Sequence, residues 1–217
     1  MKERPILFSG PMVRAILDGR KTQTRRVVKP QPVGRQRVIE GLAHVTRGMN
    51  PADDGAVWYV GDCISSGVEI RCPFGSPGDR LWVKETWCRG RAFVFYRADC
   101  GGDPPSEYTD DWNAPLVDRW RPSIHMPRSA SRLTLEVVSV RVERAQDISD
   151  ADAIAEGIER TGDGRWRHYL KPDYAFRLDP RESFSTLWDS MYGRGPWAWK
   201  HNPRVFVNEF KRSEKTS

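Results

Sequence analysis

Residues 19–26 read Gly-Arg-Lys-Thr-Gln-Thr-Arg-Arg, and they follow directly on an apolar helical pattern. Ser9 is suited to cap that helix, and Pro11 has the fixed φ of a first helical position. The apolar residues of the helix recur at helical spacing, and Gly19 allows the left-handed conformation that ends a helix and turns the chain. The stretch therefore predicts a helix, a sharp turn and then a cationic, hydroxyl-rich segment.

That segment alternates as a strand does from Lys21 to Val28, with Gln23 and Arg25 on one face and Thr24 on the other. If the strand begins at Lys21, this lysine lies on the Gln23 face, away from Thr24. If Lys21 still belongs to the turn, its side chain can converge with Thr24. Both arrangements are open at this stage.

Composition indicates a globular protein with an anionic partner. The 217 residues suffice for one decorated domain or two small ones, and we expect one domain with insertions. The formal net charge is +6, from 35 basic against 29 acidic residues, and arginines cluster at 14–37 and 119–144. Such clusters suit nucleic acid, although a solvated basic surface is an equally good interpretation of charge alone.

No apolar run approaches the ~20 residues that cross a bilayer, and the N-terminus lacks a signal-peptide pattern. We therefore expect no membrane partner and a cytoplasmic location, the host cytoplasm if a phage encodes the chain. The four cysteines form no C-x-x-C pair, which predicts free thiols, no metal and no cofactor. A metal site built from Cys63, Cys72 and a histidine is an alternative that the missing spacing disfavours.

Further along the chain, the sequence predicts strands joined by polar segments. Residues 29–78 are rich in Pro and Gly and predict loops around one or two strands. Strands are expected at 80–87, 92–96, 131–142 and 204–210, with a phase shift near Ser139.

Two helices are expected after the third of these strands. Ser149 and Asp152 form a capping-box start for a short helix to about Glu156, ended by Gly157, with Ile148 placed to staple Ala153. A second helix carries an apolar face of Phe184, Leu187, Trp188 and Met191. This order predicts an α+β fold, a small mixed β-barrel with helices at its rim.

Five segments together carry a resemblance to a known family. They are residues 16–25, residues 77–87 (Pro-Gly-Asp-Arg-Leu-Trp-Val-Lys-Glu-Thr-Trp), Ile124-His-Met-Pro-Arg128, residues 148–157, and the closing tryptophan-rich helix and strand. In this order the chain resembles an ASCH-domain protein of the PUA-like superfamily, in the larger phage and prophage form. The segments frame about half of the chain but span nearly its whole length. The resemblance implies a single domain over 1–217, with insertions at about 30–76, 98–121 and 159–181.

The resemblance also implies a cleft for RNA or a modified nucleoside. Some small ASCH proteins are amidohydrolases that remove the acyl group from N4-acetylcytidine, and their lysine, threonine and glutamate correspond to Lys21, Thr24 and Glu156. Neighbouring arginines would disfavour the charged form of Lys21, which could then accept the Thr24 hydroxyl proton. Thr24 would attack the amide carbonyl, and Glu156 would carry a proton to the leaving amine. Purely structural roles for the three residues are the competing interpretation.

Eight further residues are candidates for contacts with a nucleic acid or nucleotide: Arg20, Arg25, Arg26, Arg80, Lys84, Trp87, His125 and Arg128. Each also has an ordinary structural interpretation, since strand-edge charges protect against aggregation and most of the nine tryptophans must pack. Two main hypotheses remain: an amidohydrolase of acylated nucleosides, or a non-catalytic module that binds RNA, DNA or a modified nucleoside. A ribonuclease is a third, which no metal cluster or histidine pair supports.

Overall fold

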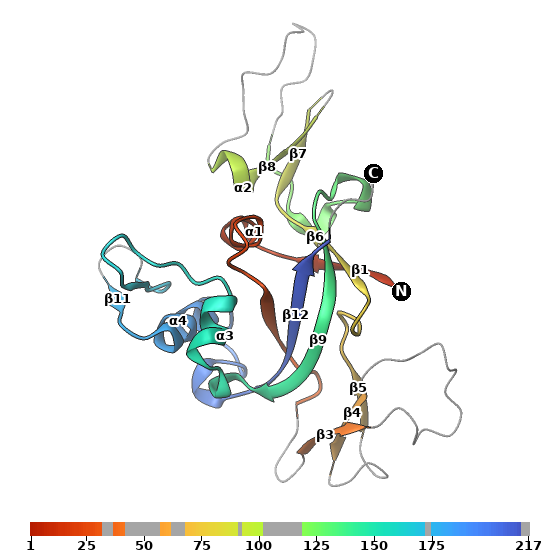
Figure 1. The fold of residues 1–217 in the computed structure, drawn as a ribbon, viewed down its shortest axis with the longest axis vertical. Helices are drawn as coiled ribbons and strands as arrows, with labels where there is room; N and C mark the ends of the chain where they lie inside the picture. The colour runs from red at the N-terminus through yellow and green to blue at the C-terminus, as the bar shows by residue number, and fades with distance from the viewer. Residues whose placement is uncertain are drawn as a thin grey trace, which may run out of the picture.

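The centre of the molecule is a five-stranded mixed sheet. The computed structural model describes residues 1–31, 37–41, 57–61, 68–90, 93–101, 119–171 and 175–213. The strands of the sheet are β1 (Glu3–Leu7), β2 (Gln23–Val27), β6 (Arg80–Lys84), β9 (Thr134–Arg144) and β12 (Arg204–Arg212). Their order is β1-β6-β9-β12-β2, with β1 parallel to β6 and the other pairs antiparallel (Figure 1).

The two edge strands of this sheet approach each other. Arg26 on β2 donates from Nη2 to the backbone oxygen of Leu7 on β1 at 2.7 Å, although the strands stand at opposite ends of the order. Helix α1 (Gly10–Leu17) links the same two strands. The sheet is therefore strongly curled, and its concave face, called here the inner face, holds a core of Ile6, Phe8, Val13, Ile16, Leu81, Val83, Leu133, Leu135, Val137 and Phe210.

A bulge lets the two longest strands serve this curled sheet. The register of β9 and β12 shifts between Glu209 and Phe210, opposite Ser139 and Val137. A bulge bends a strand and changes which face its side chains occupy. The predicted phase shift near Ser139 is this bulge, and β9 is visibly bent in Figure 1.

Two helices cover the outer face on the β2 and β12 side. They are α3 (Asp150–Ala155) and α4 (Pro180–Tyr192), whose apolar side chains pack with Val205 and Val207 of β12. The Ser149 hydroxyl accepts from the Asp152 amide, so Ser149 is the cap that the sequence predicts. Ile148 and Ala153 are both in this core, as the predicted staple requires. Met191, however, is 47% exposed, so the predicted apolar face of α4 is wrong at that position.

The remaining elements lie at the two ends of the central sheet. At one end are the antiparallel strands β3 (Arg37–Gly41), β4 (Val57–Gly61) and β5 (Val68–Arg71). At the other end are the hairpin of β7 (Trp87–Arg89) and β8 (Val94–Tyr96) and the short α2 (Arg97–Cys100) (Figure 1). A small hairpin of β10 (Trp166–Arg167) and β11 (Phe176–Arg177) lies next to α4. Short 3-10 turns are η1 (Ser123–His125), η2 (Arg128–Ala130), η3 (Ala145–Asp147) and η4 (Trp199–His201).

Several sequence predictions are confirmed, and two more need correction. The α+β class is confirmed, while closure into a barrel stays a prediction. Gly19 has φ +74° and follows α1, as expected. The segment 29–78 contains three strands where one or two were predicted, because short apolar islands paired with one another. The strand predicted at 80–87 is broken after Lys84, and β7 begins at Trp87 to pair with β8. None of the helices in the described part of the chain is long and apolar enough to span a bilayer.

Candidate functional site

Lys21 lies in the turn before β2 and not in the strand. Its amide donates to the backbone oxygen of Ala15 at 2.9 Å, and its backbone forms an isolated bridge with Glu156 at the end of α3. This approach needs a glycine beside it. Gly157 has φ +84°, and a Cβ there would lie 2.9 Å from the Cβ of Lys21. Of the two arrangements left open by the sequence, the structure therefore has Lys21 in the turn.

The Lys21 side chain is buried and fully hydrogen-bonded. Its ammonium donates to the backbone oxygens of Gln23 and Glu156, both at 2.8 Å, and to Oε2 of Glu156 at 2.9 Å. Burial lowers the pKa of Lys21, the Glu156 carboxylate opposes this shift, and Arg26 and Arg25 add to it. The pKa direction is the one expected from the crowding by arginines, but burial is the larger cause. All three ammonium protons are engaged, so Lys21 can act as a base only after the ammonium has lost one of them.

Arg25 extends this pair into a buried network on the outer face. Its guanidinium contacts three carboxylates: Nη1 donates to Oε1 of Glu156 at 3.2 Å, Nη2 to Oδ2 of Asp152 at 2.9 Å, and Nη2 and Nε to Glu143. The Arg25 side chain is 0% exposed. A phosphate cannot reach this guanidinium, so Arg25 does not serve as the predicted nucleic-acid contact in this arrangement.

Arg141 joins the same carboxylates from β9. It donates to Glu143 at 3.1 Å and to Asp152 at 2.9 Å, and it also pairs with Glu209. Burial raises the pKa of Asp152, but the charges and hydrogen bonds of Arg25 and Arg141 outweigh this and leave the pKa below its ordinary value. The Asp152 carboxylate thus ties α3 to the sheet through two arginines. The network holds Glu156 in place against Lys21.

Thr24 points to the other face of β2. Gln23 and Arg25 contact α3 and its surroundings, whereas Arg26 packs over the rings of Phe8 and Phe74 on the inner face. Because side chains alternate along a strand, Thr24 shares the inner face with Arg26. Thr24 is 4% exposed and lies opposite Asn208 in the register of β2 and β12. The structure therefore brings Lys21 and Glu156 into direct contact. Thr24 follows Lys21 by three positions in the chain and lies on the inner face.

Three buried nitrogen donors on the inner face lack a partner among the described residues. They are Nε of Arg4, Nε of Arg26 and Nδ2 of Asn208, and we call them the inner-face donors. They surround the segment of Cys72 and Phe74. The Cys72 thiol donates to Oδ1 of Asn208 at 3.1 Å, the charge of Arg4 lowers the thiol pKa, and Arg26 lies 5.6 Å from the centre of the Phe74 ring.

An unsatisfied buried donor is costly, about 1–3 kcal/mol each, and most native groups avoid it. All of the inner-face donors are N–H groups, so what would complete them is a hydrogen-bond acceptor. Arg4 and Arg26 are half-buried as residues, but their Nε atoms and the Asn208 side chain are buried, so a ligand from solvent reaches these donors only after the side chains that cover them move. Lys21 adds a positive charge nearby, since its ammonium lies 5.6 Å from the centre of the Phe8 ring, which Arg26 also covers.

The other predicted contact residues are dispersed over the surface. Arg20 pairs with Asp18, and Arg128 pairs with Glu3 at 3.0 Å. Lys84 lies over Trp82 and donates to the backbone oxygen of Ile124. Arg80 and Lys84 are half-buried and lie on the face of β6 opposite the buried Leu81 and Val83. His125 is exposed in η1, and Trp87 is only 4% exposed. These residues do not gather around Lys21.

The sequence analysis missed Arg4, Asn208 and the role of Asp152. Asn208 carried a usable signal, because alternation places this amide on the same strand face as Phe206 and Phe210. Arg4 carried a weaker one, with Ile6 two residues on. Asp152 was assigned to the capping box, and its carboxylate instead binds Arg25 and Arg141. The pairing of the Asp152 carboxylate with these two arginines depends on contacts between distant segments, and no local pattern indicates it.

The described residues contain no cluster of three or more metal-ligating side chains. Burial raises the pKa of the Cys72 thiol to about 11, so the thiol is protonated near neutral pH. Cys63, its partner in the alternative metal site, lies outside the described residues.

Comparison of the chain with family models, curated proteins and solved structures gave no match.

Proposed function

We propose that this protein binds a nucleoside or nucleotide, free or within RNA or DNA, through the inner-face donors. The observation that carries the proposal is the set of three N–H groups, on Arg4, Arg26 and Asn208, that have no partner among the residues that the structure describes. Nucleobases and phosphates are rich in acceptors, and the positive charges of Arg4, Arg26 and Lys21 suit a phosphate group. The resemblance to ASCH proteins, which bind RNA or modified nucleosides, supports the same ligand class.

Apolar rings beside the donors also fit a base or sugar. Phe8 and Phe74 lie on either side of the Arg26 guanidinium, at 5.5 and 5.6 Å from ring centre to the guanidinium carbon. Aromatic side chains next to arginines are a common setting for single-stranded nucleic acid. The net charge of +6 would assist association with a polyanion.

The test is binding of N4-acetylcytidine, cytidine monophosphate and a short single-stranded RNA, measured by calorimetry at two salt concentrations. Arg26→Gln and Asn208→Leu should each weaken binding by about tenfold, because each removes one hydrogen bond to the ligand. Asn208→Leu removes the buried unpaired Nδ2 but also the Oδ1 that accepts from the Cys72 thiol, so the two effects oppose each other and the unfolding free energy should change by no more than about 1–2 kcal/mol. Unchanged affinity in both variants would place the site elsewhere.

A second candidate function is hydrolysis of an acylated nucleoside. The contact of Lys21 with Glu156 at 2.9 Å and the lowered pKa of Lys21 favour it. In this mechanism Lys21 first loses one ammonium proton to solvent, and the neutral amine then takes the Thr24 hydroxyl proton. The hydroxyl oxygen forms a bond to the amide carbonyl carbon. The carbon–nitrogen bond breaks as Lys21 passes that proton, through Glu156, to the leaving amine. Water then releases the acyl group as an acid and restores the threonine.

Chromatography of N4-acetylcytidine incubated with the protein tests this candidate. Turnover should yield cytidine and acetate in equal amounts, and Thr24→Val should abolish it while leaving the melting temperature nearly unchanged. Intact substrate after prolonged incubation with a protein that binds it would leave binding as the function and exclude this hydrolysis.

A further inference from the structure

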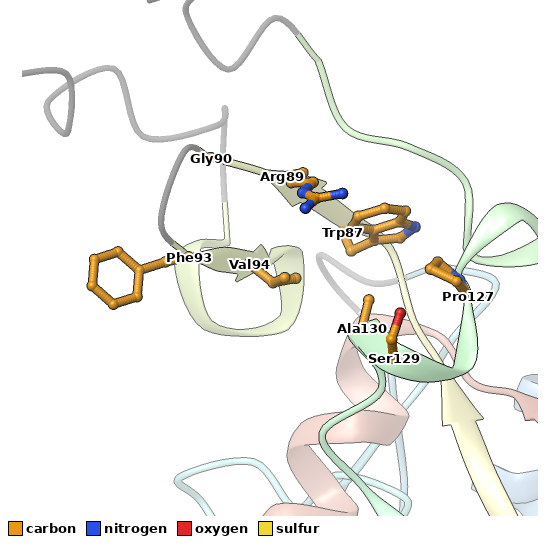
Figure 2. Close-up of a pocket in the computed structure, with 8 residues that line it drawn as sticks. All are labelled: Trp87, Arg89, Gly90, Phe93, Val94, Pro127, Ser129 and Ala130. Atoms are coloured by element: carbon orange, nitrogen blue, oxygen red, sulfur yellow. The ribbon is translucent and has the colours of Figure 1, made fainter. Parts of the chain in front are cut away.

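The hairpin of β7 and β8 and the segment 127–130 enclose a second pocket, which lies apart from the inner-face donors. Its volume is about 250 Å³, and it is lined by Trp87, Arg89, Gly90, Phe93, Val94, Pro127, Ser129 and Ala130 (Figure 2). The walls combine apolar side chains with one cation and one hydroxyl. The nucleic-acid interpretation predicted only Trp87 among these residues.

The pocket contains an unpaired donor. Trp87 is 4% exposed, and its indole N–H has no hydrogen-bond partner in the described part of the chain. In Figure 2 the nitrogen-bearing end of the indole points to the side of Pro127, another residue of the pocket wall. A buried tryptophan N–H normally finds an acceptor, so an acceptor from a ligand that enters beside Pro127 would complete this one.

Positive charge surrounds the same indole. Arg89 is exposed and has no ion-pair partner among the described residues, and Figure 2 shows its guanidinium reaching towards Trp87. The guanidinium carbon of Arg121 lies 5.3 Å from the centre of the Trp87 ring, and the backbones of these two residues pair at 2.7 and 3.2 Å. A ligand with its acceptor at the indole therefore has a site for an anionic group at the mouth of the pocket.

The walls of the pocket are held firmly. Trp87, Met126 and Ala130 form one buried cluster with Val94 and Tyr96. The Tyr96 hydroxyl donates to the backbone oxygen of Ala130 at 2.9 Å, which ties β8 to η2. The pocket is consequently a preformed feature of the fold, and a ligand would not have to assemble it.

We propose that this pocket binds a pyrimidine nucleotide, with a base carbonyl accepting from the Trp87 indole and the phosphate on Arg89. The ligand class rests on the proposed function, while the site is separate. A flat ring with a carbonyl acceptor suits the single donor and the apolar walls, and a phosphate suits the exposed cation of Arg89. For a single-stranded nucleic acid this would be a second base site, in addition to the inner-face donors.

The experiment is a two-dimensional ¹⁵N–¹H spectrum of the tryptophan indole groups, titrated with uridine monophosphate, with uridine and with inorganic phosphate. Trp87→Phe identifies the Trp87 signal by its disappearance. Uridine monophosphate should move that signal downfield, as expected when the N–H gains an acceptor, and uridine should move it at higher concentration. Arg89→Gln should weaken the nucleotide by about five- to tenfold. Arg194→Gln, which removes another exposed arginine, is the matched control and should bind as the wild type does.

Failure of this proposal is distinguishable from failure of the proposed function. If uridine monophosphate binds but leaves the Trp87 signal in place, and if Arg26→Gln weakens binding while Arg89→Gln does not, the pocket is not a site and the inner-face donors are. An equal shift with inorganic phosphate alone would overturn the assignment of a base. A Trp87 signal that none of the three compounds moves up to millimolar concentration would overturn it as well.

Discussion

Replacing Glu156 by glutamine should destabilise the protein far more than an equivalent change at its surface. The Glu156 carboxylate is buried between two cations, Lys21 at 2.9 Å and Arg25 at 3.2 Å. Glutamine keeps the shape and removes the charge. Whichever way the amide turns, its NH₂ group faces one of the two cations, and Lys21 remains buried with only carbonyl acceptors. Removing one partner of a buried ion pair costs about 3–5 kcal/mol.

For a chain of this length 1 kcal/mol corresponds to about 2–4 °C in melting temperature, so Glu156→Gln should melt roughly 6–20 °C below the wild type. The control is Glu136→Gln, which removes a carboxylate paired with Lys211 at 3.0 Å where both side chains are largely open to solvent. That variant should lose about 0–1 kcal/mol. Urea unfolding followed by circular dichroism gives both free energies. If the two variants lie within 1 kcal/mol of each other, the argument that the Lys21–Glu156 pair supports the fold is wrong.

Three further predictions concern other parts of the molecule. Gly157→Ala should cost at least about 1–2 kcal/mol, because a Cβ at φ +84° is strained and would lie 2.9 Å from the Cβ of Lys21; a thermal melt equal to the wild type would contradict this. Burial raises the pKa of Glu85 above its ordinary 4.5, so the folded state keeps this proton to a higher pH than the unfolded state does. The unfolding free energy should therefore fall as pH rises above 4.5. Glu85→Gln should lack this contribution to the pH dependence when urea unfolding is measured between pH 4 and 8. Iodoacetamide at pH 8 should modify the exposed Cys100 and spare the buried Cys72, whose pKa is about 11, until urea is added, which peptide mass mapping will show.

Local signals predicted the elements of the fold because the forces that form them act over a few residues. Gly19 ends α1, Ser149 caps α3, and the burial of Leu81 and Val83 follows their alternation in β6. The start of β7 was harder to predict, because local alternation continues from β6 and does not show that the chain pairs with β8 instead. The curl of the sheet depends on contacts between β1 and β2, and alternation within either strand does not report it.

The candidate site was predictable only in part, for a related reason. Lys21 and Glu156 stand 135 positions apart, so the sequence joined them only through the resemblance to a family. Charge counting suggested that the arginines after Gly19 act together on an anion. In the structure Arg20 is paired with Asp18, and three carboxylates from β9 and α3 surround Arg25. Local composition overstated the free positive charge because the neutralising residues come from elsewhere in the chain.

The alternation of β2 separates two kinds of role within four residues. Gln23 and Arg25 face α3. Each guanidinium nitrogen of Arg25 donates to a carboxylate there, and these hydrogen bonds hold α3 against the sheet. Thr24 and Arg26 face the inner side, where Arg26 and Asn208 keep buried donors unpaired. The hydrogen-bond donors on the α3 side of β2 all have acceptors, whereas the inner-face donors have none among the described residues, which costs stability. A ligand that supplies the missing acceptors would explain this cost. The proposed function therefore rests on Thr24 and Arg26 rather than on the arginine cluster as a whole.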